Sequence, residues 1–243
     1  MDIKTWLKVK ILGYRATSPT YIEYLKKCGV KVGKDVKIYR PFNTTIDVQA
    51  PHLLSIGDHV QMTGPVTILT HDYSWSVIKR KYGDIFGSQR KTVIGNNVFI
   101  GWGATILGGS NIGNNVIIGA NSVVSGYIES NAVYAGNPAR KLMTLNEYYK
   151  KRKSNQLSEA VNFVKEYQKR FNQIPSEDKL NEYFFLFKPT KLNKKFISQL
   201  ELMENYERSK KKLYENYRFS SYKGFIEYCL KTEETRNSFK KKE

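Results

Sequence analysis

The chain holds three histidines, and one of them stands where a proton-transfer group would be useful. His52, His59 and His71 are the only histidines among 243 residues. An imidazole with an ordinary pKa near ~6.5 exchanges a proton at neutral pH, which suits general acid–base catalysis. His71 follows the apolar run Ile68-Leu69-Thr70 and directly precedes a long polar segment. His71 is therefore the candidate general base, although its position alone also fits a packed or surface histidine. We assign no role to the other two.

Other reactive side chains give weaker signals. Asp72 could orient the His71 imidazole, but adjacent residues of an extended chain point to opposite sides, so its role stays open. Cys28 and Cys229 are far apart and show no paired spacing, as expected of reduced thiols in a cytoplasmic protein. The histidines are spaced by seven and twelve residues, and none follows His71. This spacing argues against a three-histidine zinc site, and we expect no metal.

A six-residue repeat must position these groups. It is clearest between Thr92 and Arg140, where one phase of the repeat is always apolar and β-branched. The next position is small in five of six repeats, and a short residue recurs four positions later. The apolar phase comprises Ile94, Ile100, Ile106, Ile112, Ile118 and Val124.

The period of six indicates a solenoid of parallel strands. A helix places apolar residues about 3.6 apart and a free-standing strand alternates them, so neither accounts for a period of six. A short strand followed by a tight corner does, because the branched residue then points inward and glycine relieves the corner. Stacked coils pair their backbones with the coils above and below.

One segment interrupts the repeat. Ile68 and Ile94 are 26 residues apart, which is not a multiple of six. The inserted segment, His71–Lys91, carries Trp75 and a cluster of basic residues. Long loops on rigid scaffolds are commonly functional, so we expect this insert to border the site.

The motifs IGNNVFIGWGATIL, IGNNVIIGANSVV and VYAGNPARKL resemble those of the hexapeptide-repeat acyltransferases. The resemblance covers about Val30 to Leu142. It implies a left-handed parallel β-helix, acetyl-CoA as co-substrate and a homotrimer. The left hand comes from the resemblance alone, because physics by itself favours right-handed crossovers between parallel strands.

The resemblance also implies roles for individual residues. The segment ILTHDYSW is similar to the family segment that bears the catalytic histidine, which implies that His71 is the general base. The segment PFNTTI implies that Asn43 contacts substrate and histidine. Trp75, in the insert, is expected to contact the acceptor. Trp102 is a large aromatic residue beside a repeat corner and is exposed by geometry, so we expect it to contact the acceptor or line the thioester channel, with packing between trimer subunits as the alternative. The implied acetyl-CoA groove, beside the late coils and between two subunits, comprises Gly101, Trp102, Gly119, Ala120, Ser125 and Arg140.

The fold class expected is mainly β, with helical segments on both sides of the β-helix. Residues 1–30 are predicted as an N-terminal helical arm, whose first helix has a basic face, and Ser18-Pro19 starts its second helix. Residues 31–143 are predicted as the β-helix, with an inserted loop at 72–91. Residues 144–243 are predicted as an α-helical extension. It opens with a capping box at Thr144 and Glu147 and includes helices from Pro175, from Lys194 to Tyr217, and from Tyr222 to Leu230.

Composition limits the function classes. The net charge is +18 and is spread over the whole chain, which speaks to partners rather than fold. We find no nucleic-acid-binding motif and expect no nucleic-acid partner. No apolar run approaches the ~20 residues of a membrane span. The basic amphipathic arm leaves peripheral membrane association open, so we expect a cytoplasmic protein, whether or not it contacts the inner face of the cell membrane.

The interpretation that follows is an acetyl-CoA-dependent O-acetyltransferase. Its acceptor would be a sugar hydroxyl on a sugar, nucleotide-sugar or glycan, and the extension resembles the tails of acyltransferases from capsular or exopolysaccharide clusters. We expect a backbone N–H near Gly101 or Trp102 to hold the developing oxyanion. Three alternatives remain: an N-acetyltransferase acting on an amino-sugar nucleotide or another amine, a non-catalytic trimeric scaffold, and a zinc hydratase of the same architecture.

Overall fold

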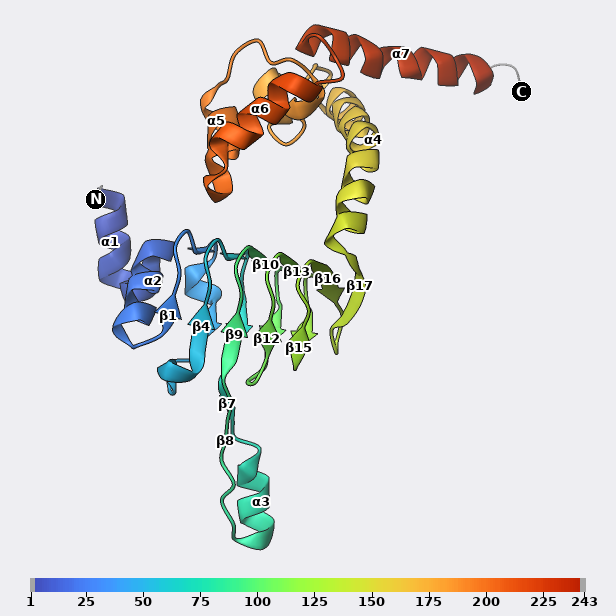
Figure 1. Ribbon diagram of the computed structural model, residues 1–243. Helices are drawn as coiled ribbons and strands as arrows, with labels where there is room; N and C mark the ends of the chain where they lie inside the picture. Colours follow the sequence, from blue (N-terminus) through green and yellow to red (C-terminus); the bar gives the residue numbers. More distant parts are fainter. Residues whose placement is uncertain (1–2, 241–243) are drawn as a thin grey trace. The chain divides into compact units, whose positions relative to one another are not determined.

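The computed structural model describes residues 3–240 and divides into two compact units, Met1–Tyr149 and Lys150–Glu243 (Figure 1). Residues 1–2 of the predicted arm and 241–243 of the predicted extension lie outside the described residues. The first unit contains a β-helix with helices before its first coil, and the second unit is helical.

The β-helix has three faces, each a sheet of short strands stacked coil upon coil. Face one consists of β1 (Lys31–Val32), β4 (Leu54–Ile56), β9 (Thr92–Ile94), β12 (Asn111–Ile112) and β15 (Tyr127–Ile128). Face two consists of β2 (Lys37–Ile38), β5 (Gln61–Met62), β10 (Val98–Ile100), β13 (Val116–Ile118), β16 (Ala132–Ala135) and β17 (Arg140–Thr144). Face three consists of β3 (Thr45–Ile46), β6 (Thr67–Ile68), β11 (Thr105–Ile106) and β14 (Val123–Val124). Strands pair in parallel within each face, except that β17 returns antiparallel to β16.

Stacked isoleucines form the core, as the period of six predicts. Ile94 lies opposite Ile112 on face one, and Ile100 lies opposite Ile118 on face two. All four are at most 1% exposed. Each such side chain contributes roughly 1.5–3 kcal/mol by leaving water. The short inward positions are satisfied as well, since the buried hydroxyl of Ser122 donates to a backbone carbonyl 2.8 Å away.

The edge between faces one and two carries a ladder of left-handed residues. Asp35, His59, Asn97, Asn115 and Asn131 all have φ between 48° and 59°. Asparagine and aspartate tolerate this conformation better than most residues. Asn97 donates to Asn115 at 2.8 Å, and Asn115 donates to Asn131 at 2.9 Å. His59 occupies one rung and its Nδ1 lies 3.2 Å from an Asp35 carboxylate oxygen, so this histidine belongs to the scaffold.

The insert leaves the β-helix between β6 of face three and β9 of face one. It is not an irregular loop. β7 (His71–Asp72) and β8 (Ser88–Gln89) pair antiparallel as a ribbon, and the chain that connects them forms α3 (Trp75–Tyr82) beyond the end of the ribbon (Figure 1). At the base of the ribbon, the backbone N–H of Arg90 donates to the carbonyl of Thr70 at 2.8 Å.

The N-terminal arm comprises α1 (Ile3–Leu12), the 3₁₀ turn η1 (Gly13–Ala16) and α2 (Ser18–Lys27). Thr17, rather than Ser18, caps α2 through a capping box with Thr20. Tyr21 of α2 is buried, and its hydroxyl donates to the carbonyl of Thr44 at 3.1 Å. This hydrogen bond joins α2 to the first coil.

The helical unit packs around a second, aromatic core. Its elements are α4 (Leu145–Phe171), whose first residues belong to the first unit, η4 (Glu177–Leu180), η5 (Phe184–Leu186), α5 (Lys194–Glu201), η6 (Leu202–Glu204), α6 (Tyr206–Asn216) and α7 (Tyr222–Lys240). The predicted capping box is present: Thr144 N donates to Glu147 at 2.7 Å, and Glu147 N donates back to Thr144 Oγ1 at 3.2 Å. In the core, the rings of Phe184 and Phe196 stack with centroids 4.4 Å apart.

Three helix predictions in this unit need correction. The predicted helix from Lys194 to Tyr217 is two helices, because Met203 adopts φ 65° and breaks it. The helix predicted from Pro175 is only the 3₁₀ turn η4, and α7 runs past Leu230 to Lys240. Apolar spacing of 3.6 continues across a break of this kind, so periodicity alone does not reveal it.

Candidate active site

The imidazole of His71 is held by a buried carboxylate from the preceding coil. Its Nδ1 lies 2.5 Å from Oδ2 of Asp47. The Asp47 side chain is only 5% exposed, whereas that of His71 is 17% exposed. Since an ionised carboxylate only accepts hydrogen bonds, Nδ1–H is the donor. The other ring nitrogen, Nε2, is then left as an acceptor.

Asp47 is fixed from several directions. Oδ2 also accepts hydrogen bonds from the backbone N–H of Thr70 at 3.0 Å and from the Thr70 hydroxyl, and Oδ1 accepts from the N–H of Gln49 at 2.9 Å. Burial by itself would raise the pKa of Asp47, but the hydrogen bonds from Thr70, Gln49 and His71 together lower it below its ordinary value. Asp47 is therefore a permanently charged orienting group at neutral pH.

The coil register explains why these residues meet. Ile46 of β3 lies opposite Ile68 of β6, and the N–H of Asp47 donates to the carbonyl of Ile68 at 2.9 Å. Both strands end at the same edge, between faces three and one. Asp47 and His71 therefore leave neighbouring coils at one corner, although they are 24 residues apart. Sequence reasoning missed Asp47; the available signal was its place directly after an apolar repeat position.

Asp72, the orienting residue left open above, is engaged elsewhere. Its Oδ1 accepts from Ser74 N at 3.0 Å and from the Ser74 hydroxyl, and Oδ2 lies 3.8 Å from Arg90. These contacts hold together the base of the ribbon. Asp47 takes the place beside His71 that Asp72 was considered for.

Aromatic rings lead from His71 into the insert. The ring of Tyr73 meets the imidazole edge-on with centroids 5.3 Å apart, and Tyr73 lies 5.7 Å from Trp75. Tyr73 is 57% exposed. Trp75, predicted to contact the acceptor, is thus two rings away from His71 and on the same edge.

Most of the other predicted site residues lie at the opposite edge of face three. Asn43 ends the 3₁₀ turn η2 (Pro41–Asn43), which precedes β3, and Trp102 precedes β11. Trp102 is 45% exposed, and the Arg40 guanidinium lies over its ring at 4.8 Å. Within one chain, neither Asn43 nor Trp102 is brought to His71, which follows the far end of this face.

The small residues predicted for acetyl-CoA are required by the stacking itself. A Cβ on Gly101 would lie 2.7 Å from the backbone N of Ala120, and one on Gly119 would lie 2.7 Å from Cβ of Ala135. The N–H of Gly101 donates to the carbonyl of Ile118 at 2.9 Å, so it is not available to an oxyanion, which leaves Trp102 of the two expected positions.

The remaining predicted contacts divide between two places. Ser125 follows β14 and so lies at the same edge as His71. Arg140 begins β17 on face two, is exposed, and its guanidinium donates to the carbonyl of neighbouring Ala139 at 3.3 Å.

Within residues 3–240, no group of three or more metal-ligating side chains is gathered. His52 is exposed on the 3₁₀ turn η3 (Pro51–Leu53), and His59 is in the ladder. Cys28 and Cys229 are free thiols. No helix of the described part is long and apolar enough to cross a membrane.

The comparisons with known proteins agree with this architecture. Residues 91–126 match the family model described as bacterial transferase hexapeptide (six repeats). The chain is 40% identical over 124 residues to Protein CapG of Staphylococcus aureus, covering 51% of this chain and 71% of that protein. It is 34% identical over 129 residues to galactoside O-acetyltransferase of Escherichia coli strain K12, covering 53% and 60%.

Two solved structures align with part of the chain. A galactoside acetyltransferase in complex with coenzyme A is 24% identical, with a TM-score of 0.45, covering 60% of this chain and 84% of that one. A maltose O-acetyltransferase from Clostridium difficile 630 is 24% identical, with a TM-score of 0.38, covering 59% and 89%.

Proposed function

The chain belongs to the bacterial hexapeptide-repeat transferase family, whose coils form a left-handed parallel β-helix, and from this we propose that it is an acetyl-CoA-dependent O-acetyltransferase acting on a sugar hydroxyl. The observation that carries the proposal is the Asp47–His71 pair, a base oriented by a buried carboxylate at the root of an aromatic insert. The galactoside O-acetyltransferase relative supports a sugar hydroxyl as acceptor. The resemblance of the helical extension to the tails of capsular or exopolysaccharide acyltransferases supports a surface glycan, or its nucleotide-sugar precursor.

In this proposal each residue of the pair has one role. Nε2 of His71 takes the proton of the acceptor hydroxyl while its oxygen forms the new ester bond. The imidazolium is stabilised by Asp47 and then returns the proton to the departing thiolate, so proton balance is kept within one histidine. Acetyl-CoA supplies the activated acetyl group as a thioester. No acyl-enzyme is required, and the Cys229 thiol is buried, with a pKa raised to about 11 by burial.

We further propose a homotrimer. The predicted acetyl-CoA residues Gly101, Gly119 and Ala120 lie at one edge of face three, and His71 leaves the other. A site that uses both needs the edges of two neighbouring chains, which supports the assembly implied by the family resemblance.

We also propose a cytoplasmic location with peripheral attachment to the inner membrane face. Use of acetyl-CoA supports the cytoplasmic location. The membrane attachment is supported by α1, in which Ile3 is 79% exposed, Leu7 47% and Ile11 78%, and in which Lys10 lies over the Trp6 ring at 4.3 Å. Apolar side chains and lysines on one helix are typical of a helix that lies on an anionic bilayer.

The test is acetyl-CoA turnover with a panel of sugars, nucleotide-sugars, amino-sugars and polysaccharides. His71→Ala should lower turnover by about 10²–10⁴ while acetyl-CoA still binds. His52→Ala removes an exposed histidine outside the site and serves as the control. Turnover that survives His71→Ala would reject the catalytic assignment, and failure to bind acetyl-CoA would favour the scaffold alternative.

A further inference from the structure

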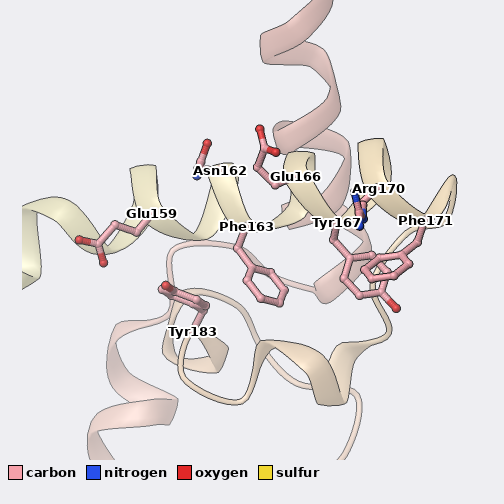
Figure 2. Close-up of a pocket in the computed structure, with 8 residues that line it drawn as sticks. All are labelled: Glu159, Asn162, Phe163, Glu166, Tyr167, Arg170, Phe171 and Tyr183. Carbon is pink, nitrogen blue, oxygen red and sulfur yellow. The ribbon is translucent and has the colours of Figure 1, made fainter. Parts of the chain in front are cut away.

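The helical unit contains a groove that the proposed reaction does not use. It runs along α4 from Glu159 to Phe171, is closed on one side by Tyr183, and has a volume of about 630 Å³. Figure 2 shows its lining side chains, with aromatic rings along one side of the helix and Asn162 and Glu166 along the other. We call it the α4 groove.

Its aromatic side is a continuous wall. Phe163, Tyr167 and Phe171 recur every fourth residue and therefore lie on one side of the helix. The ring centroids of Phe163 and Tyr167 are 6.3 Å apart, and those of Tyr167 and Phe171 are 4.7 Å apart. Tyr183 adds a ring whose centroid lies 6.1 Å from that of Phe163. Phe171 is 58% exposed. Four rings in an open groove offer flat apolar faces that the folded unit itself leaves partly uncovered.

The opposite side is a polar edge with unused hydrogen-bonding capacity. Glu159 is already held by Arg152 at 2.6 and 2.8 Å. By contrast, the side chains of Asn162, Glu166 and Arg170 make no hydrogen bond or ion pair within the described part of the chain. Together they present an amide, a carboxylate and a guanidinium, which can donate to and accept from neighbouring hydroxyls.

The charges of the lining residues limit the class of ligand that the α4 groove can bind. The chain as a whole carries +18, yet the groove is lined by two carboxylates and one guanidinium. Because Arg152 already pairs with Glu159, the charges left to a ligand are the Glu166 carboxylate and the Arg170 guanidinium, which cancel. A phosphorylated or acidic ligand would therefore find no net positive charge there. A small organic cation would suit the rings but would meet Arg170. A neutral ligand with one apolar and one hydroxyl-rich aspect satisfies both sides.

We propose that the α4 groove binds a neutral pyranose segment of a glycan. The C–H faces of the sugar rings stack on the aromatic wall, whose ring faces carry partial negative charge, and the hydroxyls bond to the polar edge. This gives the helical extension a task of holding a polymeric acceptor by residues distinct from the acetylation site. The choice of a saccharide rests on the proposed function, while the binding itself does not require it.

Binding is measured on the full chain without acetyl-CoA, by calorimetry and saturation-transfer NMR. The probes are maltotetraose, a tetramer of N-acetylglucosamine and a β-linked galactose tetramer. At least one should bind, and Tyr167→Ala and Phe171→Ala should each weaken it by roughly three- to tenfold. Glu166→Gln, an exposed change that leaves the fold intact, should weaken it as well. Tyr214→Ala is the matched control, because Tyr214 is 48% exposed on α6 and outside the groove.

Three results would overturn the inference. They are no binding of any probe at millimolar concentration, equal binding by Tyr167→Ala and Tyr214→Ala, and tighter binding of tetramethylammonium than of all the sugars. This binding experiment is separate from the turnover assay of the proposed function. A chain that binds glycan here but transfers no acetyl group in that assay would reject only the proposed function. The converse result would reject only the groove.

Discussion

Replacing Asp47 by asparagine keeps the shape of the orienting group and removes its charge. The two oxygen positions of Asp47 both face backbone N–H donors: Oδ1 faces Gln49, and Oδ2 faces Thr70 as well as the Thr70 hydroxyl and His71. The amide oxygen of the introduced asparagine should therefore occupy the Oδ2 position, where it satisfies more donors. Nδ1–H of His71 then still has an acceptor, and the imidazole keeps its tautomer.

The magnitude follows from this orientation. The loss is that of a charge-assisted hydrogen bond to a buried carboxylate, worth about 1.5–3 kcal/mol. At about 1.4 kcal/mol for each factor of ten, kcat/KM should fall by about ten- to 150-fold. That is less than a wrong tautomer would cost, about 10⁴ in a comparable triad. The amide NH₂ now faces the N–H of Gln49, which should cost about 1–3 kcal/mol of folding stability.

The assay is steady-state acetyl transfer on an identified acceptor, together with thermal unfolding. Asp72→Asn, which removes a nearby carboxylate bonded to Ser74 and Arg90, is the control and should stay near wild type in kcat/KM. An unchanged kcat/KM for Asp47→Asn would show that the pair is not used. A loss near 10⁴ would show that the amide flips, and would refute the reasoning from Gln49 and Thr70.

Three further predictions test the scaffold and its charges. The hydrogen bonds that lower the pKa of Asp47 stabilise the fold at pH values above the unfolded-state pKa of an aspartate, near ~3.9, and this stabilisation is lost as the pH falls through the lower folded-state pKa. The free energy of unfolding measured in urea should therefore fall more for wild type than for Asp47→Asn between about pH 5 and pH 3. An equal pH dependence of the two proteins would contradict this. Gly95→Ala should cost about 1–3 kcal/mol in thermal unfolding because its Cβ would lie 2.6 Å from the Gly113 carbonyl, whereas Gly87→Ala, with open space around it, should change stability by less than ~0.5 kcal/mol. Burial raises the pKa of Cys229 to about 11, so at pH 8 about one thiol in a thousand is ionised; iodoacetamide should label partly exposed Cys28 first in the native protein, and comparable labelling of both would mean that the helical core is open.

The period of six was enough to predict the coils, because each apolar repeat position lands on its counterpart one coil away. It also located His71, whose corner marks the break in the repeat. The period did not predict that Asp47 contacts His71, because the early coils have irregular spacing. Only the register of Ile46 with Ile68 shows which corners of the coils are neighbours. Asn43 was assigned from the resemblance, and Trp102 also from its exposed place beside a repeat corner; neither argument says which edge of one chain the residue occupies relative to His71.

The helical unit shows a different limit. The capping box at Thr144 and Glu147 was predictable because it is local. The break at Met203 was not, because a left-handed methionine has no sequence signature and apolar spacing continues through it. The α4 groove likewise depends on a turn bringing Tyr183 beside Phe163, a long-range contact that no local pattern contains.

The insert is closed at its base, by the β7–β8 pairing and by the bond from Arg90 N to Thr70 O, and Ile68 and Ile94 keep their stacking partners on either side of it. Its outer part can thus lengthen, shorten or change composition without disturbing the coils that hold Asp47 and His71. On the proposed function, this arrangement places the proton-transfer pair and the acceptor-binding insert on separate parts of the chain, so the insert can change while the pair stays the same. Related chains could then differ in acceptor through differences in the insert alone. The segment between Asp72 and Gln89 is the natural unit to graft when a preference for a different acceptor is engineered.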